Sequence, residues 1–232
     1  MEQTPAGPPS YLLALLQLSD SALPTGAFSH SFGMEMYLER GLITNEADFA
    51  RWLGEFVAIQ LVHNDGLAIR LALEAGPVED VFRLDAMLAA AALPREIREA
   101  GTKMGLRMLD IARQVAPGPE LDEYAVRVAD GRCAGHPAIA VGLVGRALSI
   151  PAPELVAAYL FSTVTSLTQN AIRAIPIGQN AGQRVLRGAH SVVGEAVAAI
   201  AALDESEFGA AAPGLEIAQM RHERQRARIF MS

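Results

Sequence analysis

The chain has 232 residues, 51% of them hydrophobic, with a net charge of −7 and a single cysteine, Cys133. This length fits one large domain, and the apolar share is enough for a core with some apolar surface left for subunit or partner contacts. An acidic chain with few aromatic residues is a poor ligand for nucleic acid, whose phosphates bind basic patches. One cysteine excludes an intrachain disulfide.

The first ten residues, 1–10, lack the basic start of a signal peptide and contain two adjacent prolines, so we expect a flexible leader. No apolar run approaches the roughly 20 residues that span a bilayer. The best candidate, Ala138 to Ile150, is short and interrupted by Arg146. We therefore expect a cytoplasmic protein with no membrane partner.

Helical periodicity runs through the whole chain, whereas no convincing stretch has the alternation of a strand. In chain order, the expected helices cover residues 11–18, 32–40, 44–63, 66–74, 78–92, 94–115, 120–129, 136–148, 154–175 and 179–203. Residues 204–214 are expected to be a linker. The sequence thus predicts an all-α fold, a single-domain helical bundle of roughly nine or ten helices over residues 11–220, followed by a tail at 221–232.

Residue types at the ends of these segments support their assignment as helices. Pro94 stands at a first helical position, and Pro176 ends the helix before it, because the residue preceding proline is pushed out of the helical region. The 94–115 helix is amphipathic, as expected in a bundle. The 136–148 helix is apolar nearly all round, which predicts a buried central helix.

Motifs of known chemistry are missing from the sequence. It contains no G-x-x-x-x-G-K-[ST] phosphate loop, no G-x-S-x-G elbow and no H-E-x-x-H. Cys133 and His136 could supply two metal ligands, but a zinc site usually needs three or four, and a buried thiol before a helix explains them as well. We expect no metal, no cofactor and no enzymatic activity of the chain alone.

The first of three unusual segments, the corner segment 18–35, joins two expected helices. It is polar, contains glycine and proline, and is longer than the usual helix connection of about 2–8 residues. Its serines and Asp20 can cap helices, so an elaborate helix–helix corner is one interpretation. A binding surface is the other.

The second segment is a polar stripe on the 154–175 helix, followed by a turn. Ser162, Ser166, Gln169 and Arg173 recur at spacings of four, three and four, so they share one face. A solvated face would explain such a stripe. The absence of lysine and glutamate from it favours a buried or interfacial polar network instead.

The third segment, the tail 221–232, has four arginines against one glutamate in an otherwise acidic chain. It ends in Ile229, Phe230 and Met231 before Ser232. Arginine with aromatic and methionine side chains is typical of protein interfaces. A disordered terminus is the alternative.

Together the three segments resemble the UreF family of urease accessory proteins. The family's N-terminal signature is matched by Leu16, Ser19, Asp20, Pro24, Gly26, Phe28, Ser29, Ser31, Gly33 and Glu35. Its Gln-x-x-x-Arg-x-x-Pro-x-Gly-Gln block is matched by Gln169, Arg173, Pro176, Gly178 and Gln179. Its ending is matched by His222, Glu223, Arg228, Phe230 and Ser232. His30 departs from the family, in which tyrosine is common there.

The resemblance implies an all-α chaperone that forms a homodimer and binds the accessory protein UreD (also called UreH). That complex recruits the GTPase UreG and docks on apo-urease, where GTP hydrolysis is coupled to nickel insertion. We expect the partner-binding residues to be Pro24, Gly26, Phe28, Ser29, His30, Ser31, Glu35, Ser166, Gln169, Arg173, Pro176, Gly178, Gln179, Arg228, Phe230 and Ser232.

Two other functions stay open at this point. The chain could regulate GTP hydrolysis by UreG in trans, with Arg173 as an arginine finger, although a structural ion pair is the more ordinary role for such a residue. It could also carry nickel itself, since imidazole suits nickel, but its five histidines are scattered and give no evident site.

Overall fold

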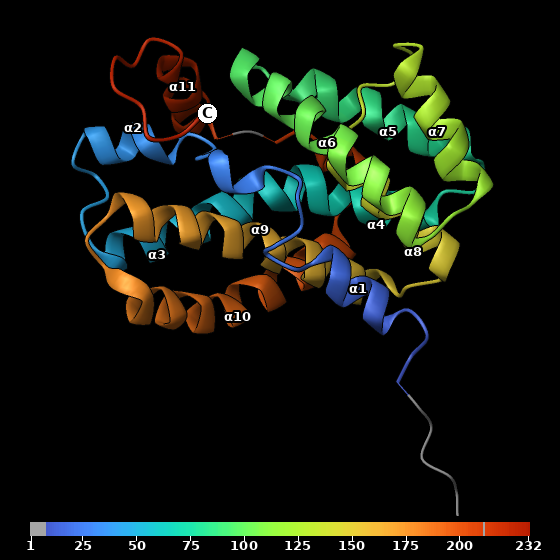
Figure 1. Ribbon diagram of the computed structural model, residues 1–232, viewed down its shortest axis with the longest axis horizontal. Coiled ribbons are helices and arrows are strands. Elements are labelled where there is room, and N and C mark those ends of the chain that lie inside the picture. The colour runs from blue at the N-terminus through green and yellow to red at the C-terminus, as the bar shows by residue number, and fades with distance from the viewer. Residues whose placement is uncertain (1–7, 211) are drawn as a thin grey trace, which may run out of the picture.

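The computed structural model describes residues 8–210 and 212–232, and over these ranges it contains helices and no strand (Figure 1). The α-helices are α1 Leu12–Leu18, α2 Met34–Glu39, α3 Glu46–Glu55, α4 Leu67–Glu74, α5 Val78–Ala91, α6 Arg95–Val115, α7 Pro119–Ala129, α8 Pro137–Leu148, α9 Ala152–Ala174, α10 Gly178–Ala202 and α11 Pro213–His222. A π-helix, Phe56–Gly66, and two short 3-10 helices, Ala27–Ser29 and Glu205–Glu207, complete them. The predicted all-α fold is confirmed. The predicted leader falls largely on residues 1–7, outside the described residues.

The helix that runs through the middle of the body is longer than expected. The predicted break between 44–63 and 66–74 is wrong, because α3, the π-helix and α4 form one continuous helix, Glu46–Glu74. Gly66 does not end a helix. A Cβ atom there would lie 2.4 Å from Cδ1 of Ile200, so the glycine allows α10 to pack closely.

Helix α8 is the buried centre that its composition predicts. Every residue from Pro137 to Gly145 is buried, and α8 packs against α4 and α6. The amphipathic face of α6 supplies Met104 and Met108 to this packing. The core therefore forms around α8 because its apolar residues leave no side of the helix suited to water.

The expectation that no segment could span a bilayer needs correction. Two helices, Glu46–Glu74 and α10, are long and apolar enough to cross a membrane, judged by length and composition alone. Each has a stretch that contains few charged residues. The first is largely a core helix, and buried helices of water-soluble proteins meet the same criterion. The second pairs with α9, and its exposed residues include Arg184, Arg187 and Glu195 as well as glycines and alanines.

The end of the chain contains a helix that the predicted linker and tail do not include. Pro213 begins α11, in keeping with the preference of proline for the first helical turn, and His222 ends it. Residues 223–232, which we call the strap, then return across the body. Figure 1 shows α11 and the end of the strap beside α2, which places Met34–Glu39 next to the end of the sequence.

Candidate docking site

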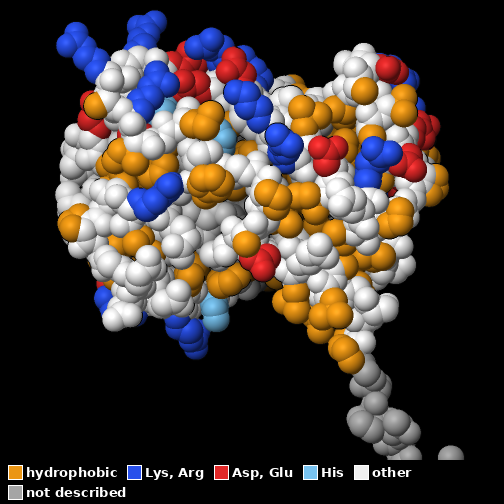
Figure 2. Space-filling view, viewed as in Figure 1, with side chains coloured by type: hydrophobic (Ala, Val, Ile, Leu, Met, Phe, Trp, Pro, Cys, Tyr) orange, Lys and Arg blue, Asp and Glu red, His pale blue; other side chains and the backbone are white. Residues whose placement is uncertain are grey.

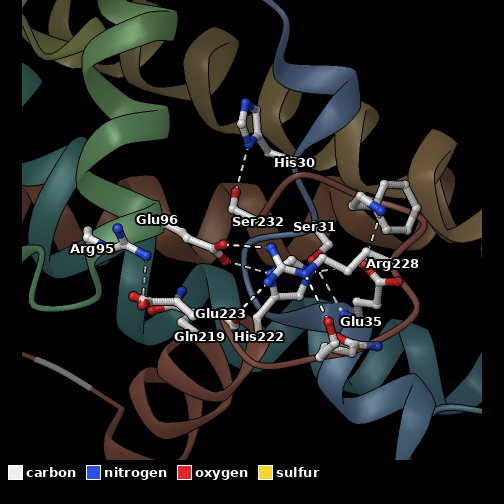
Figure 3. A network of polar contacts seen from close by, with 12 residues as sticks. His30, Ser31, Glu35, Arg95, Glu96, Gln219, His222, Glu223, Arg228 and Ser232 are labelled. Carbon is white, nitrogen blue, oxygen red and sulfur yellow. Dashed lines mark hydrogen bonds and ion pairs between the residues drawn. The ribbon is translucent and has the colours of Figure 1, made fainter.

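The three unusual segments meet at one place, and Glu35 of α2 lies at its centre (Figure 3). One carboxylate oxygen of Glu35 accepts the backbone N–H of Ile229. The other accepts the N–H of Phe230 at 3.0 Å and lies 3.1 Å from Nε2 of His222. Glu35 is buried. A residue of the corner segment therefore fixes both the end of α11 and the middle of the strap.

A second carboxylate, Glu96 of α6, lies on the other side of the His222 ring. Its Oε2 atom is 2.7 Å from Nδ1 of His222, and its Oε1 atom accepts a hydrogen bond of 2.7 Å from Arg228. Burial alone would raise the pKa of Glu96, but the hydrogen bonds from His222 and Arg228 outweigh burial and lower that pKa. The strap is thus tied to α6 as well as to α2.

Beyond Phe230, the strap pairs with the backbone of the corner segment. The carbonyl of Ser232 accepts the N–H groups of Ser31 and Phe32, the latter at 3.1 Å, and the N–H of Met231 donates to Ser29 at 2.8 Å. The hydroxyl of Ser232 lies 2.7 Å from Nδ1 of His30. Burial, with a smaller effect from the charge of Lys103, lowers the pKa of His30. A neutral imidazole beside a hydroxyl suits this buried position.

Helix α9 completes the site through Arg173 and Asn170. The Arg173 guanidinium donates to the carbonyl of Phe28 and, at 2.6 Å, to the side chain of Asn170. It also lies 5.1 Å from the ring centroid of Phe230. Asn170 in turn donates to the carbonyl of His30 at 2.7 Å. Sequence reasoning missed Asn170, although its position one turn before Arg173 was a usable signal.

The structure divides the predicted residues of the corner and the tail into buried and exposed groups. The buried predicted residues are His30, Ser31, Glu35, Phe230 and Ser232. These side chains contact the chain's own backbone and core while the strap lies in this position. A direct contact with a partner would require the strap to move, so their role in the structure as it stands is to position their neighbours.

The exposed apolar residues at this place are Phe28, Ile229 and Met231, with 58%, 62% and 55% of their surface accessible. Along the strap they alternate with the buried Phe230 and Ser232, so one side of the strap faces inward and the other outward. Figure 2 shows hydrophobic and basic side chains interspersed at the end of the molecule where α2, α11 and the strap lie. Ile229 and Met231 were not among the predicted partner-binding residues, although the composition of the tail included them.

Other predicted residues lie elsewhere. Ser166 lines a groove of about 600 Å³ whose wall also includes Met104 of α6. Gln169 is half-buried on α9. Pro176, Gly178 and Gln179 are exposed on the turn between α9 and α10, and Pro24 and Gly26 lie in the turns of the corner segment. The polar stripe therefore extends from the groove to the docking site rather than forming one surface.

Cys133 and His136 lie in a loop whose backbone is hydrogen-bonded to the side chain of Asp85. The buried carboxylate of Asp85 accepts the N–H groups of Ala134 and His136 and the hydroxyl of Tyr124, at 2.7 Å for the hydroxyl. Nδ1 of His136 caps α8 by accepting the N–H of Ala138. Burial and the charge of Asp85 raise the pKa of the Cys133 thiol. Among the residues that the structure describes, no cluster of three histidine, cysteine or acidic side chains is arranged to hold a metal ion.

Comparison with known proteins places the chain in a family. The UreF family model matches residues 43–190. The chain is 59% identical to the urease accessory protein UreF of Arthrobacter sp. (strain FB24), over 96% of this chain and 98% of the relative. It is 46% identical to that of Lachnoclostridium phytofermentans, over 96% and 99%. For Bacillus sp. (strain TB-90) the identity is 41%, over 95% and 99%. Because the relatives match nearly its whole length and the family model matches more than half of it, the chain belongs to the UreF family of urease accessory proteins.

Proposed function

We propose that this protein is a non-enzymatic cytoplasmic chaperone for nickel insertion into apo-urease. It acts as a homodimeric scaffold that binds UreD (UreH) and, in that complex, the GTPase UreG. Membership of the UreF family supports this role, as does a sequence without a phosphate loop of its own. The observation that carries the proposal is that residues of all three sequence motifs meet at one internally braced surface.

The part of that surface offered to a partner is what we call the outer face. It is formed by Ile229 and Met231 of the strap and by Phe28 of the corner segment, with Arg173 of α9 at its edge. Aromatic, methionine and arginine side chains are enriched among the residues that dominate binding energy. The internal contacts of Glu35 and Phe230 fix the backbone beneath these side chains. A surface fixed before binding loses less conformational entropy when the partner arrives.

The test is binding of UreD to the full chain carrying Ile229→Ala and Met231→Ala together. We expect binding at least about tenfold weaker, because truncating anchor residues of this kind often costs about 2 kcal/mol or more. Thermal stability should hardly change, since both side chains are exposed.

Val126→Ala is the matched control, because Val126 is an apolar residue of α7 with 55% of its surface exposed. UreD binding that stays the same in the double variant and in the control would contradict the proposed surface. Deleting residues 228–232 is less informative, because the deletion also removes the internal contacts of Phe230 and Ser232.

The alternative function, stimulation of GTP hydrolysis by an arginine finger at Arg173, has less support. The guanidinium of Arg173 is already occupied by Phe28, Asn170 and the ring of Phe230. A finger must reach the phosphates of the partner's nucleotide. GTP turnover by UreG that falls with Arg173→Ala, in a complex that still assembles, would favour this alternative over the scaffold alone.

A further inference from the structure

The hydrogen-bond partners around His222 indicate where its protons lie. A neutral imidazole has one donor and one acceptor, whereas an ionised carboxylate only accepts. Both oxygens of Glu35 already accept backbone N–H groups of the strap, and Glu96 accepts Arg228. Each carboxylate also faces one ring nitrogen of His222, at 3.1 and 2.7 Å. With both carboxylates ionised, both ring nitrogens must donate, so this arrangement requires an imidazolium.

The charges around the ring balance in the same state. His222 is fully buried, and two carboxylates, one guanidinium and one imidazolium sum to zero. Arg95 and Glu223 form a separate pair at the edge, 3.1 Å apart. His30 of the corner segment, Lys103 of α6 and Arg173 of α9 are further titratable or charged side chains at this place. A neutral ring would leave the buried carboxylate of Glu35 and the partly buried carboxylate of Glu96 with one cation, an arrangement that is costly away from water.

We propose that the strap is a proton-dependent latch, closed while His222 is an imidazolium and opened by loss of that proton. The inference rests on the proposed function only in that the strap carries the partner-facing side chains. When the ring loses this proton, one ring nitrogen presents a lone pair to the carboxylate of Glu35 or Glu96, and the two repel each other. These two carboxylates hold Ile229, Phe230 and Arg228 of the strap. The direction is therefore fixed: raising the pH opens the latch.

Opening the latch would dismantle the docking surface. The strap would leave Ser29, Ser31 and Phe32, and the Phe230 ring would leave Arg173. Phe28 on the body and the two outer side chains of the strap would then no longer form one fixed face. The outer face thus exists as a single surface only in the protonated state, which makes partner docking sensitive to pH.

Nitrogen-15 NMR of the histidine rings in the isolated full chain tests the protonation state directly. We expect both ring nitrogens of His222 to carry a proton at neutral pH. As the pH is raised, the loss of that signature should coincide with faster hydrogen exchange of the Ile229 and Phe230 amides. A ring nitrogen with a free lone pair at neutral pH would overturn the proposal, as would amide protection that persists after the ring has lost its proton.

His222→Gln provides the variant test, because glutamine cannot donate to both carboxylates from one position as the imidazolium does. We expect the Phe230 amide to exchange at least about tenfold faster, the factor implied by losing one charged hydrogen bond, while the amide of Leu143 in α8 stays protected. His63→Gln is the control, since the His63 ring is hydrogen-bonded to the carbonyl of Glu207 rather than to the strap. Unchanged exchange at Phe230 in a folded His222→Gln protein would overturn the latch.

The outcomes for the latch and for the proposed function remain separate. The NMR and exchange measurements use the chain alone and need no partner. Suppose that the Ile229→Ala and Met231→Ala double variant loses UreD binding, while the wild-type NMR spectrum shows no imidazolium. This pair of results would reject the latch and retain the scaffold. If His222→Gln does not fold, the wild-type titration decides.

Discussion

Nε2 of His222 lies 3.1 Å from Oε2 of Glu35, although 187 residues separate the two in the chain. This contact connects the first signature of the sequence with the last. The contact explains why Glu35 is buried, since a carboxylate on a helix as short as α2 would otherwise face water. The signatures that look like three separate features in the sequence are parts of one interaction network.

Glu35→Gln should destabilise the protein by about 3–5 kcal/mol, the usual cost of breaking a buried ion pair from one side. The amide retains the shape of the side chain but removes the charge opposite His222, and its NH₂ group faces donors of the strap. The free energy of unfolding from urea titration at neutral pH measures the effect.

Glu39→Gln is the control for this prediction, because Glu39 lies on the same helix and is exposed. Its effect should stay within about 0.5 kcal/mol. Equal losses in the two variants would show that charge on α2, rather than the contact with His222, determines the stability.

The sequence patterns predict much of the helical fold but not which side of the strap faces inward. Pro94, Pro176 and the apolar 136–148 segment mark local structure, and local rules suffice for them. The predicted break between residues 63 and 66 is wrong, because Gly66 permits close packing within a continuous helix, and the sequence alone does not reveal that role. Phe230 and Met231 are both apolar and adjacent. Only the contact with Arg173 and the core distinguishes the buried residue from the exposed one.

Phe230→Ala should lower stability by about 3–5 kcal/mol, as is usual for removing a buried phenylalanine ring. Only 4% of the surface of Phe230 is accessible, and its ring also contacts Arg173. Met231→Ala, on the neighbouring exposed residue, should leave the unfolding temperature nearly unchanged. If the two variants had the same stability, the inward orientation of Phe230 would be wrong.

Replacing each of two glycines on one face of α6 by alanine should change the stability of the protein in opposite directions. At Gly105 an added Cβ would lie 1.6 Å from the carbonyl oxygen of Gly135, so Gly105→Ala must displace backbone and should cost about 1–3 kcal/mol or more. At Gly101 the nearest atom, in His136, is 3.9 Å away. Gly101→Ala should therefore stabilise α6 by up to about 1 kcal/mol, the difference in helix propensity. Calorimetric unfolding of both variants tests the pair, and a loss at Gly101 as large as that at Gly105 would refute this packing.

Asp85→Asn should destabilise the loop that leads into α8. The carboxylate accepts three hydrogen bonds, and the amide would direct at least one donor toward the donors Tyr124, Ala134 or His136, at a cost of about 1–3 kcal/mol. Hydrogen exchange of the His136 amide should accelerate with the same substitution. Asp80→Asn on the exposed side of α5 is the control, and similar exchange in both variants would contradict the role of Asp85.

Glu96 should contribute stability that depends on pH in a defined direction. Hydrogen bonds from His222 and Arg228 outweigh burial and lower the pKa of Glu96 below its ordinary value of 4.5 in the folded state. A carboxyl whose folded pKa is depressed stabilises the protein above its unfolded pKa, and that contribution is lost as the pH falls through the folded pKa. The free-energy difference between wild type and Glu96→Gln should therefore be largest near neutral pH and shrink in acid.

Urea unfolding of the two proteins across the acid range measures that difference, with Glu99→Gln, an exposed neighbour on α6, as the control. The control should show no comparable dependence on pH, since Glu99 lacks the contacts that depress the pKa of Glu96. A difference for Glu96→Gln that grows as the pH falls would reverse the sign required by this pKa shift. It would also show that Glu96 does not act as the ionised partner of His222 and Arg228.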